Sequence, residues 1–211
     1  MRSRLILASQ SPRRRQLLEQ LSPVYGFELI VLKPEDTMAA EALEIPLPGE
    51  APLAYVQRVT LAKLRAGLER AEAAGFRHTP VLASDTTVAH SNEILGKPAD
   101  ADDARRMLRT LSGQVHEVLT AVAIASDAEA SPLLQVSRSE VKFAPLTEAW
   151  IDWVISTGEP MDKAGAYAIQ GHAGVQIEWV RGSPSGIMGL PLFETNILLK
   201  RALSGAAEHH P

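Results

Sequence analysis

Apolar residues along this chain follow two patterns, short β-branched runs and longer stretches with helical spacing. The short runs predict strands at residues 5–8, 27–32, 81–89, 115–125, 133–143 and 174–181. Apolar positions three and four residues apart predict helices at 13–21, 52–75, 101–111, 147–158 and 191–203. Ser11, Asp100 and Thr147 stand at helix starts, where their side chains can cap free backbone N–H groups.

An acidic residue lies in the middle of one predicted strand. Residues 81–89 begin apolar, pass through Ser84, Asp85 and Thr86, and become apolar again. A carboxylate there must be desolvated, paired with a cation or metal, or exposed at a cleft, and uncompensated desolvation is costly. The turn that starts at Asn92 then delivers Lys97 from a loop bounded by glycine and proline. An acid and a lysine on one hairpin suit a metal and a phosphate, while a water-facing Asp85 on an edge strand is the alternative.

A serine-rich turn joins the first predicted strand to the first helix. Ser11 and Pro12 start that helix, so Arg13 and Arg14 lie in its first turn. Cations at a helix N-terminus oppose the helix dipole unless an anion binds there. The pattern therefore indicates a phosphate-binding turn, and solvated arginines are the alternative.

The region after the second predicted strand gives weaker signals. Glu35 and Asp36 form an acidic turn, and either could reach a cleft. Residues 37–49 are typical of a mobile surface loop without chemistry. Lys63 lies at the edge of the apolar stripe of the long helix, where a lone lysine is usually solvated.

Small residues are dense between positions 159 and 171, as in a loop that lets another group approach the backbone closely. Gln170, between Ile169 and Gly171, offers both a hydrogen-bond donor and an acceptor, so it could bind the edge of a nucleotide base. A histidine within a predicted strand, such as His116, is more often a strand-face residue than a catalyst, so His116 is not included in the predicted site.

Composition sets limits on the class of protein. The 211 residues are 45% hydrophobic and 22% charged, which favours one globular domain over residues 1–203 with two lobes and a disordered tail at 204–211. The absence of cysteine excludes disulfides, a thiol nucleophile and zinc–thiolate sites. The net charge of −4 argues against broad nucleic-acid binding. No run approaches the roughly 18 apolar residues of a membrane span, so we expect a cytoplasmic protein without membrane contact.

Several segments together resemble the Maf family of nucleoside triphosphate pyrophosphatases. They are residues 7–14, 84–86, 95–98, 107–113, 161–171 and 189–192, which follow one another over nearly the whole chain. The resemblance implies an α/β fold similar to inosine triphosphate pyrophosphatases, with a mixed twisted sheet, flanking helices and two lobes around a central cleft. It also implies hydrolysis of a nucleoside triphosphate to the monophosphate and pyrophosphate with Mg²⁺ or Mn²⁺, and often a homodimer.

The resemblance assigns roles by position. It implies a catalytic set of Asp85, Lys63, Lys97 and Glu35, a substrate-binding set of Ser9, Arg13, Arg14, Thr86 and Gln170, and a metal held by Asp85 and Glu35. Asp85 matches the family's proton acceptor, but it could be the general base, a metal ligand or both. Glu35 matches only by its place after the second strand, and Asp36 could substitute for it.

The run from Asp162 to Gly171, together with Thr86, resembles the family branch that acts on dTTP and UTP. A pyrimidine with a keto oxygen and a ring N–H needs one donor and one acceptor, which the amide of Gln170 can supply. The alternatives are a 7-methyl-GTP pyrophosphatase of the same family and a nucleotide-binding regulator of cell division.

Overall fold

The computed structural model describes residues 3–34, 36–129 and 131–204. Within them, seven strands form one sheet in the order β2-β1-β3-β5-β6-β7, and β4 pairs with β3. The strands are β1 (Arg4–Leu7), β2 (Glu28–Val31), β3 (Val81–His90), β4 (Glu93–Leu95), β5 (Val115–Ala125), β6 (Leu133–Phe143) and β7 (Ile177–Arg181). Strand β1 pairs parallel with β2 and β3, and the other pairs are antiparallel. The predicted mixed α/β fold is confirmed.

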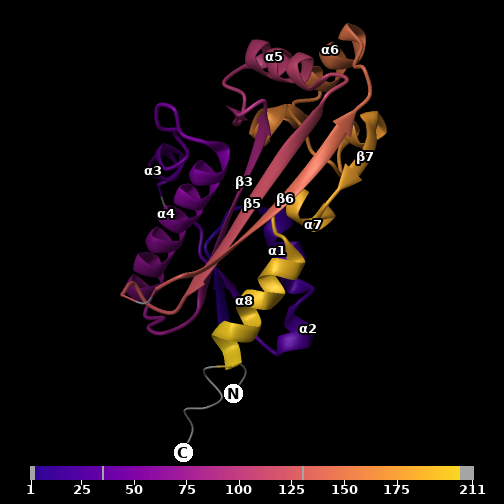
Figure 1. Ribbon diagram of the computed structural model, residues 1–211. Coiled ribbons are helices and arrows are strands. Elements are labelled where there is room, and N and C mark those ends of the chain that lie inside the picture. The colour runs from indigo at the N-terminus through magenta and orange to yellow at the C-terminus, as the bar shows by residue number, and fades with distance from the viewer. Residues whose placement is uncertain (1–2, 35, 130, 205–211) are drawn as a thin grey trace, which may run out of the picture.

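Helices flank this sheet. They are α1 (Pro12–Glu19), α2 (Ser22–Tyr25), α3 (Thr37–Ala42), α4 (Pro52–Ala73), α5 (Ala101–Leu111), α6 (Glu148–Ser156), α7 (Pro184–Ile187) and α8 (Leu192–Ser204), with 3₁₀ turns η1 (Glu159–Asp162), η2 (Ala164–Ala166) and η3 (His172–Gln176). In Figure 1 the long strands β3, β5 and β6 run along the molecule, with α3 and α4 on one side, α8 and α2 on the other, and α5 and α6 at the far end. Among the described helices, none is long and apolar enough to span a membrane.

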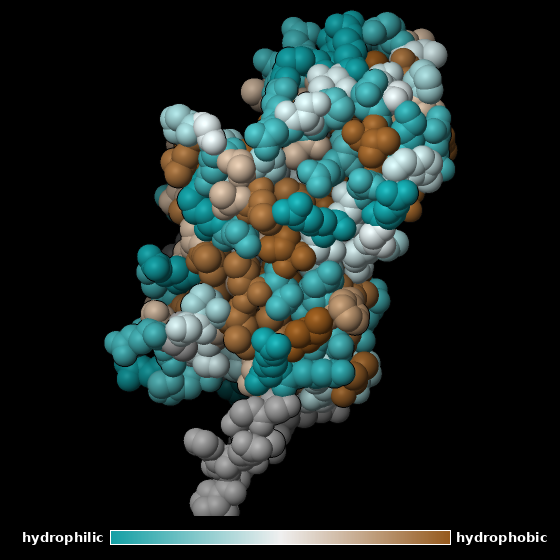
Figure 2. All heavy atoms as spheres, in the orientation of Figure 1, coloured by the Kyte–Doolittle hydropathy of each residue, from teal (hydrophilic) through white to brown (hydrophobic). Residues whose placement is uncertain are grey.

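The core follows the two faces of the sheet. Ala83 and Val81 of β3 pack in a cluster with Leu64 of α4, whereas Leu82 packs with Leu198 of α8. A third cluster joins α5 and α6 to the far ends of β5 and β6. Figure 2 shows apolar side chains gathered on the face between α4 and α8. The division of residues 1–203 into two lobes stays a prediction.

The predicted helix caps are present. The side chains of Ser11, Asp100 and Thr147 accept hydrogen bonds from the backbone N–H groups of Arg14, Asp103 and Trp150. These bonds satisfy donors that the first helical turn leaves free. Both strands predicted at 115–125 and 133–143 form, and they pair antiparallel as expected.

Other predicted elements differ from the structure. The strand predicted at 174–181 begins later, because residues up to Gln176 form the 3₁₀ turn η3 and β7 starts at Ile177. The predicted loop at 37–49 begins with helix α3, whose N-cap is Asp36. The short helices α2 and α7 were not predicted. Glu35 and the tail from 205 onward lie outside the described residues.

A glycine inside α4 sets how closely this helix approaches the sheet. A Cβ atom on Gly67 would lie 2.5 Å from the Cβ of Ala8 and 3.1 Å from Cγ1 of Val81. The missing side chain therefore lets α4 pack directly on β1 and β3. Lys63 is four residues earlier, on the same side of the helix, and is thereby carried to Asp85 of β3.

Candidate active site

Strand β3 places Asp85 on the face of the sheet that α4 covers. Side chains alternate along a strand, so Asp85 shares this face with Ala83 and Val81. Asp85 is only 5% exposed, and its Oδ1 lies 2.6 Å from Nζ of Lys63. The structure thus excludes the alternative of a water-facing Asp85 on an edge strand.

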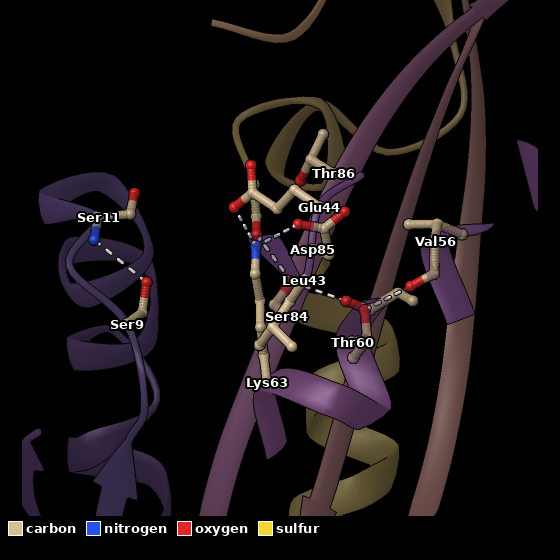
Figure 3. Close-up of polar contacts among 12 residues, drawn as sticks. Ser9, Ser11, Leu43, Glu44, Val56, Thr60, Lys63, Ser84, Asp85 and Thr86 are labelled. Carbon is tan, nitrogen blue, oxygen red and sulfur yellow. Dashed lines mark hydrogen bonds and ion pairs between the residues drawn. The ribbon is translucent and has the colours of Figure 1, made fainter. Parts of the chain in front are cut away.

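Lys63 contacts two acids at once. Its Nζ donates to Oδ1 of Asp85 at 2.6 Å and to Oε1 of Glu44 at 2.7 Å (Figure 3). Its side chain is 16% exposed, so it is not the solvated lysine that helical spacing alone suggested. The resemblance placed Lys63 in the site, and this geometry supports that placement.

Glu44 is a member of the site that the sequence analysis missed. Besides Lys63 it contacts Lys97, whose Nζ lies 2.9 Å from Oε2 of Glu44. Burial opposes ionisation of this carboxyl, but the two lysines outweigh burial and hold the pKa of Glu44 below its ordinary value. Residues 37–49 were expected to form a surface loop without chemistry, but the structure brings Glu44 of this segment into contact with two predicted site residues.

Neither Glu35 nor Asp36, the two acids proposed for the site after the second strand, is seen beside Asp85 in the described residues. Glu35 lies outside the described residues. Asp36 is exposed, and its Oδ1 accepts from the backbone N–H of Ala39 at 3.1 Å, so this carboxylate caps helix α3. In the described part of the chain, the acid that lies beside Asp85 at Lys63 is Glu44.

Arg58 of α4 holds the segment that carries Glu44. Its Nη2 donates to the carbonyl oxygen of Ile45 at 3.0 Å, and its Nε and Nη2 contact both carboxylate oxygens of Glu50 at 2.6 and 2.8 Å. One turn earlier, the hydroxyl of Tyr55 donates to the carbonyl oxygen of Glu44 at 2.7 Å. Backbone on both sides of the Glu44 side chain is therefore fixed from α4.

Arg14 and Thr86 meet on the other face of β3. Arg14 donates from Nε to the carbonyl oxygen of Gly189 at 2.9 Å and from Nη2 to Oγ1 of Thr86 at 3.4 Å. The Thr86 hydroxyl is also 3.1 Å from Oγ1 of Thr120 on β5. Burial lowers the pKa of Arg14, and the nearby charge of Asp85 partly offsets this effect. The guanidinium is thus held in one orientation, which a bidentate anion contact requires.

Ser9 lies in the turn before α1, and Arg13 lies in the first turn of that helix. The Oγ of Ser9 accepts from the backbone N–H of Ser11 at 3.1 Å, which shapes the turn before α1 (Figure 3). Arg13 is half-buried and lies near Asp162. Burial opposes ionisation of Asp162, but Lys163 and Arg13 outweigh it and lower the pKa of this carboxyl.

Gln170 lies in an exposed turn between Ala168 and Gly171, closed by a hydrogen bond from the Gly171 N–H to the Ala168 carbonyl oxygen at 3.0 Å. Earlier in the same segment, Nε2 of the buried His116 lies 2.8 Å from the hydroxyl of Tyr167. Burial, with a smaller effect of the charge of His90, lowers the pKa of His116 to about 4. His116 points into the core and supports Tyr167, so its omission from the predicted site agrees with the structure.

One cleft collects these side chains. Its volume is about 1570 Å³, and every predicted site residue in the described ranges lines it, as does Glu44: Ser9, Arg13, Arg14, Glu44, Lys63, Asp85, Thr86, Lys97 and Gln170. Cations and carboxylates alternate in its centre, which suits a substrate with several phosphates.

Comparisons with known proteins show which family the chain belongs to. The family model described as Maf-like protein matches residues 4–202. A dTTP/UTP pyrophosphatase of Polaromonas sp. (strain JS666 / ATCC BAA-500) is 55% identical over 196 residues, covering 93% of this chain and 94% of the relative. A dTTP/UTP pyrophosphatase of Burkholderia orbicola (strain AU 1054) is 56% identical over 200 residues, covering 94% and 92%.

A solved structure of the Staphylococcus aureus Ham1 protein aligns with 97% of this chain and 100% of its own length, at 10% identity and a TM-score of 0.44. The family match runs through β1, the cleft residues and α8 without a break. With the sequence identities above, it shows that the chain belongs to the Maf family.

Proposed function

We propose that this protein is a nucleoside triphosphate pyrophosphatase that hydrolyses dTTP and UTP to the monophosphate and pyrophosphate. Its membership of the Maf family and the names of the two relatives support the proposal. The observation that carries it is the row of alternating charges Lys97, Glu44, Lys63 and Asp85 within one cleft.

The cations of the cleft suit the phosphates of such a substrate. Arg13, Arg14, Lys63 and Lys97 all line the cleft, and the side chain of Lys97 is 43% exposed. Arginine can bind phosphate through two parallel bonds, and lysine acts as a compact point charge. The two lysines are already partly neutralised by Glu44, so a triphosphate would bind where its charge can replace that carboxylate.

A divalent cation, Mg²⁺ or Mn²⁺, is part of the proposal. Within the described ranges, no group of three or more His, Asp or Glu side chains forms a ready metal site. Magnesium is commonly bound by one or two protein carboxylates together with substrate phosphates and water. Asp85 and Glu44, which share Lys63, fit that donor set and would hold the ion. Once bound, it would polarise the phosphate oxygens.

The residues of the chain supply the remaining chemistry. A water molecule attacks the α-phosphorus in line with the bond to the oxygen that bridges to the β-phosphorus. Asp85 accepts a proton from this water, and Lys63 keeps the carboxylate oriented through its 2.6 Å contact. The bridging bond breaks, its electron pair leaves with pyrophosphate, and Lys63 and Lys97 offset the charge that develops.

Base selection is assigned to Gln170 and Thr86. Uracil and thymine present a keto oxygen and a ring N–H, whereas cytosine presents an amino group and an unprotonated ring nitrogen. An amide held in one orientation pairs with the first pattern and clashes with the second. A polar group left unpaired by the wrong base costs about 1–3 kcal/mol, or roughly 10- to 100-fold in kcat/KM.

We further propose that the enzyme acts on free nucleotides in the cytoplasm, binds neither nucleic acid nor membrane, and forms a homodimer. The net charge of −4 and the substrate class support the first two statements. Light scattering after size-exclusion chromatography tests the third.

The decisive experiment follows pyrophosphate and orthophosphate release from dTTP, UTP, CTP, GTP, ATP and 7-methyl-GTP with Mn²⁺ or Mg²⁺. We expect pyrophosphate as the product, with dTTP and UTP leading in kcat/KM. Release of orthophosphate alone would overturn the reaction, and a leading rate on 7-methyl-GTP would overturn the substrate assignment. Binding of nucleotides without turnover would favour a regulator.

A further inference from the structure

The turn that carries Gln170 belongs to a loop whose middle, Gly165 to Ala168, is buried and packs against the core. We call residues 159–172 the base loop. Its middle lines the cleft, through Met161 to Ala164 and Tyr167 to Gln170, but its two ends, Glu159 and His172, do not. Compact loops with neighbouring ends are held by their own side chains.

A single carboxylate closes the base loop at its ends. The backbone N–H of His172 donates to Oε1 of Glu159 at 3.0 Å and contacts Oε2 at 3.3 Å. This carboxylate also occupies the space beside Gly171, because a Cβ atom there would lie 2.1 Å from Oε1 of Glu159. Glu159, the first residue of the base loop, therefore contacts Gly171 and His172, its last two residues.

The same contact acts on the turn at Gln170. Gly171 donates from its backbone N–H to the Ala168 carbonyl oxygen at 3.0 Å, so Gln170 is enclosed by a turn whose last residue packs on Glu159. On the other side, the loop is fixed by the hydrogen bond from the Gly165 N–H to the Gly96 carbonyl oxygen at 3.0 Å and by the contact between Tyr167 and His116. The backbone that carries Gln170 is thus fixed on both sides.

We infer that Glu159 is a positioning residue for base selection: it fixes the turn that presents Gln170 and so lets the enzyme prefer uracil over cytosine. This inference rests on the proposed function. A glutamine on a mobile turn can shift and rotate its amide to follow the change from uracil to cytosine, and it then selects neither. Glu159 lies outside the cleft and acts through Gly171 and His172.

The test compares wild type with Glu159→Ala, Glu159→Gln and Gly171→Ala, and Glu148→Ala is the control. Glu148 is an exposed glutamate on α6, paired with Arg109. We expect Glu159→Ala to lower the UTP-to-CTP ratio of kcat/KM by about tenfold, since the turn loses a charge-assisted hydrogen bond. Glu159→Gln keeps an oxygen acceptor for the His172 N–H and should retain most of the ratio. Gly171→Ala displaces the carboxylate and should act like Glu159→Ala, whereas the control should match wild type.

Amide hydrogen exchange at residues 168–173 gives a second readout that needs no turnover. We expect exchange in Glu159→Ala to be faster by about tenfold or more, with Glu159→Gln close to wild type. Unchanged exchange in Glu159→Ala would overturn the positioning role. Faster exchange with an unchanged UTP-to-CTP ratio of kcat/KM would show that Glu159 only stabilises the turn, and would overturn its role in base selection. Equal rates of wild type on UTP and CTP would also overturn the inference. Absence of pyrophosphate release by wild type would instead overturn the proposed function, and the exchange data would still decide whether Glu159 holds the turn.

Discussion

Lys63 and Glu44 are 19 positions apart in the sequence, and their Nζ and Oε1 atoms lie 2.7 Å apart in the structure. This contact joins the long helix α4 to the segment before it. The same ammonium group of Lys63 also donates a hydrogen bond to Asp85 of β3. Three elements thus meet at one nitrogen atom, and the predictions below concern what each contributes.

Glu44→Gln should lower kcat/KM for UTP by about 10- to 100-fold, because hydrogen bonds to charged groups contribute about 1.5–3 kcal/mol. The amide keeps the size of the side chain but loses the carboxylate that we propose as a ligand of the divalent cation. Steady-state kinetics measure the loss, with Glu72→Gln, at an exposed position of helix α4, as control. A variant as active as the control would exclude Glu44 from the site.

Arg58→Ala should lower activity through the position of Glu44. Arg58 does not line the cleft, but it donates to backbone on both sides of Glu44. If it acts through that acid, the double variant with Glu44→Gln should lose little more activity than Glu44→Gln alone. Kinetics of the two single variants and the double variant measure this coupling, and strictly additive losses would contradict it.

Asp85→Asn should lower kcat by roughly 10²-fold or more, since a general base commonly contributes that much and the amide cannot accept the proton. The exchange is nearly isosteric, so the fold should survive, and circular dichroism checks this. A near-normal kcat would show that Asp85 is not catalytic.

Lys97→Ala should depress kcat/KM on triphosphates through the loss of a phosphate contact. Lys200→Ala, on the exposed face of α8, is the matched control and should leave the rate unchanged. A Lys97→Ala variant with a lower melting temperature but normal kinetics would assign this lysine to packing.

His116 should make the folded state sensitive to acid. Burial lowers its pKa in the folded protein to about 4, whereas in the unfolded chain it stays near 6.5. Between pH 6.5 and pH 4, His116 is protonated in the unfolded chain but neutral in the folded protein. The free energy of unfolding therefore decreases as the pH falls from 6.5 towards 4. The loss is on the order of 3 kcal/mol. Melting temperatures across this range should fall less steeply in His116→Phe, and parallel curves would contradict the prediction.

The fold could be predicted from the sequence where one local pattern has one meaning. Ser11, Asp100 and Thr147 precede apolar stripes, and each caps the helix that follows. The strand predicted at 174–181 was wrong in its first part because apolar spacing around Val175 fits a strand and a 3₁₀ turn equally well. The N–H of Gly174 bonds instead to the carbonyl oxygen of Gly171, which begins η3.

The site could be predicted where its residues lie in recognisable motifs, as Asp85 and Lys97 do on one hairpin. Lys63 was assigned by resemblance, since its helical spacing says nothing about what lies across from it. Glu44 was missed because its segment has no hydrophobic periodicity. Its position depends on hydrogen bonds from Arg58 to the backbone of Leu43 and Ile45, which are 15 and 13 positions away from Arg58 in the sequence. Only tertiary structure brings such partners together.

The glycine at position 67 has a consequence for any attempt to make a heat-resistant form of this enzyme. Glycine within a helix costs about 0.5–1 kcal/mol relative to alanine, so exchanging it is a common route to higher melting temperatures. Here the added methyl group would lie 2.5 Å from the Cβ of Ala8 and would force α4 away from the sheet. Lys63 would move with the helix, away from Asp85. The strain of this overlap would outweigh the gain that alanine usually brings within a helix, so the exchange would lower both stability and catalysis, and a stabilised variant has to keep this glycine in α4.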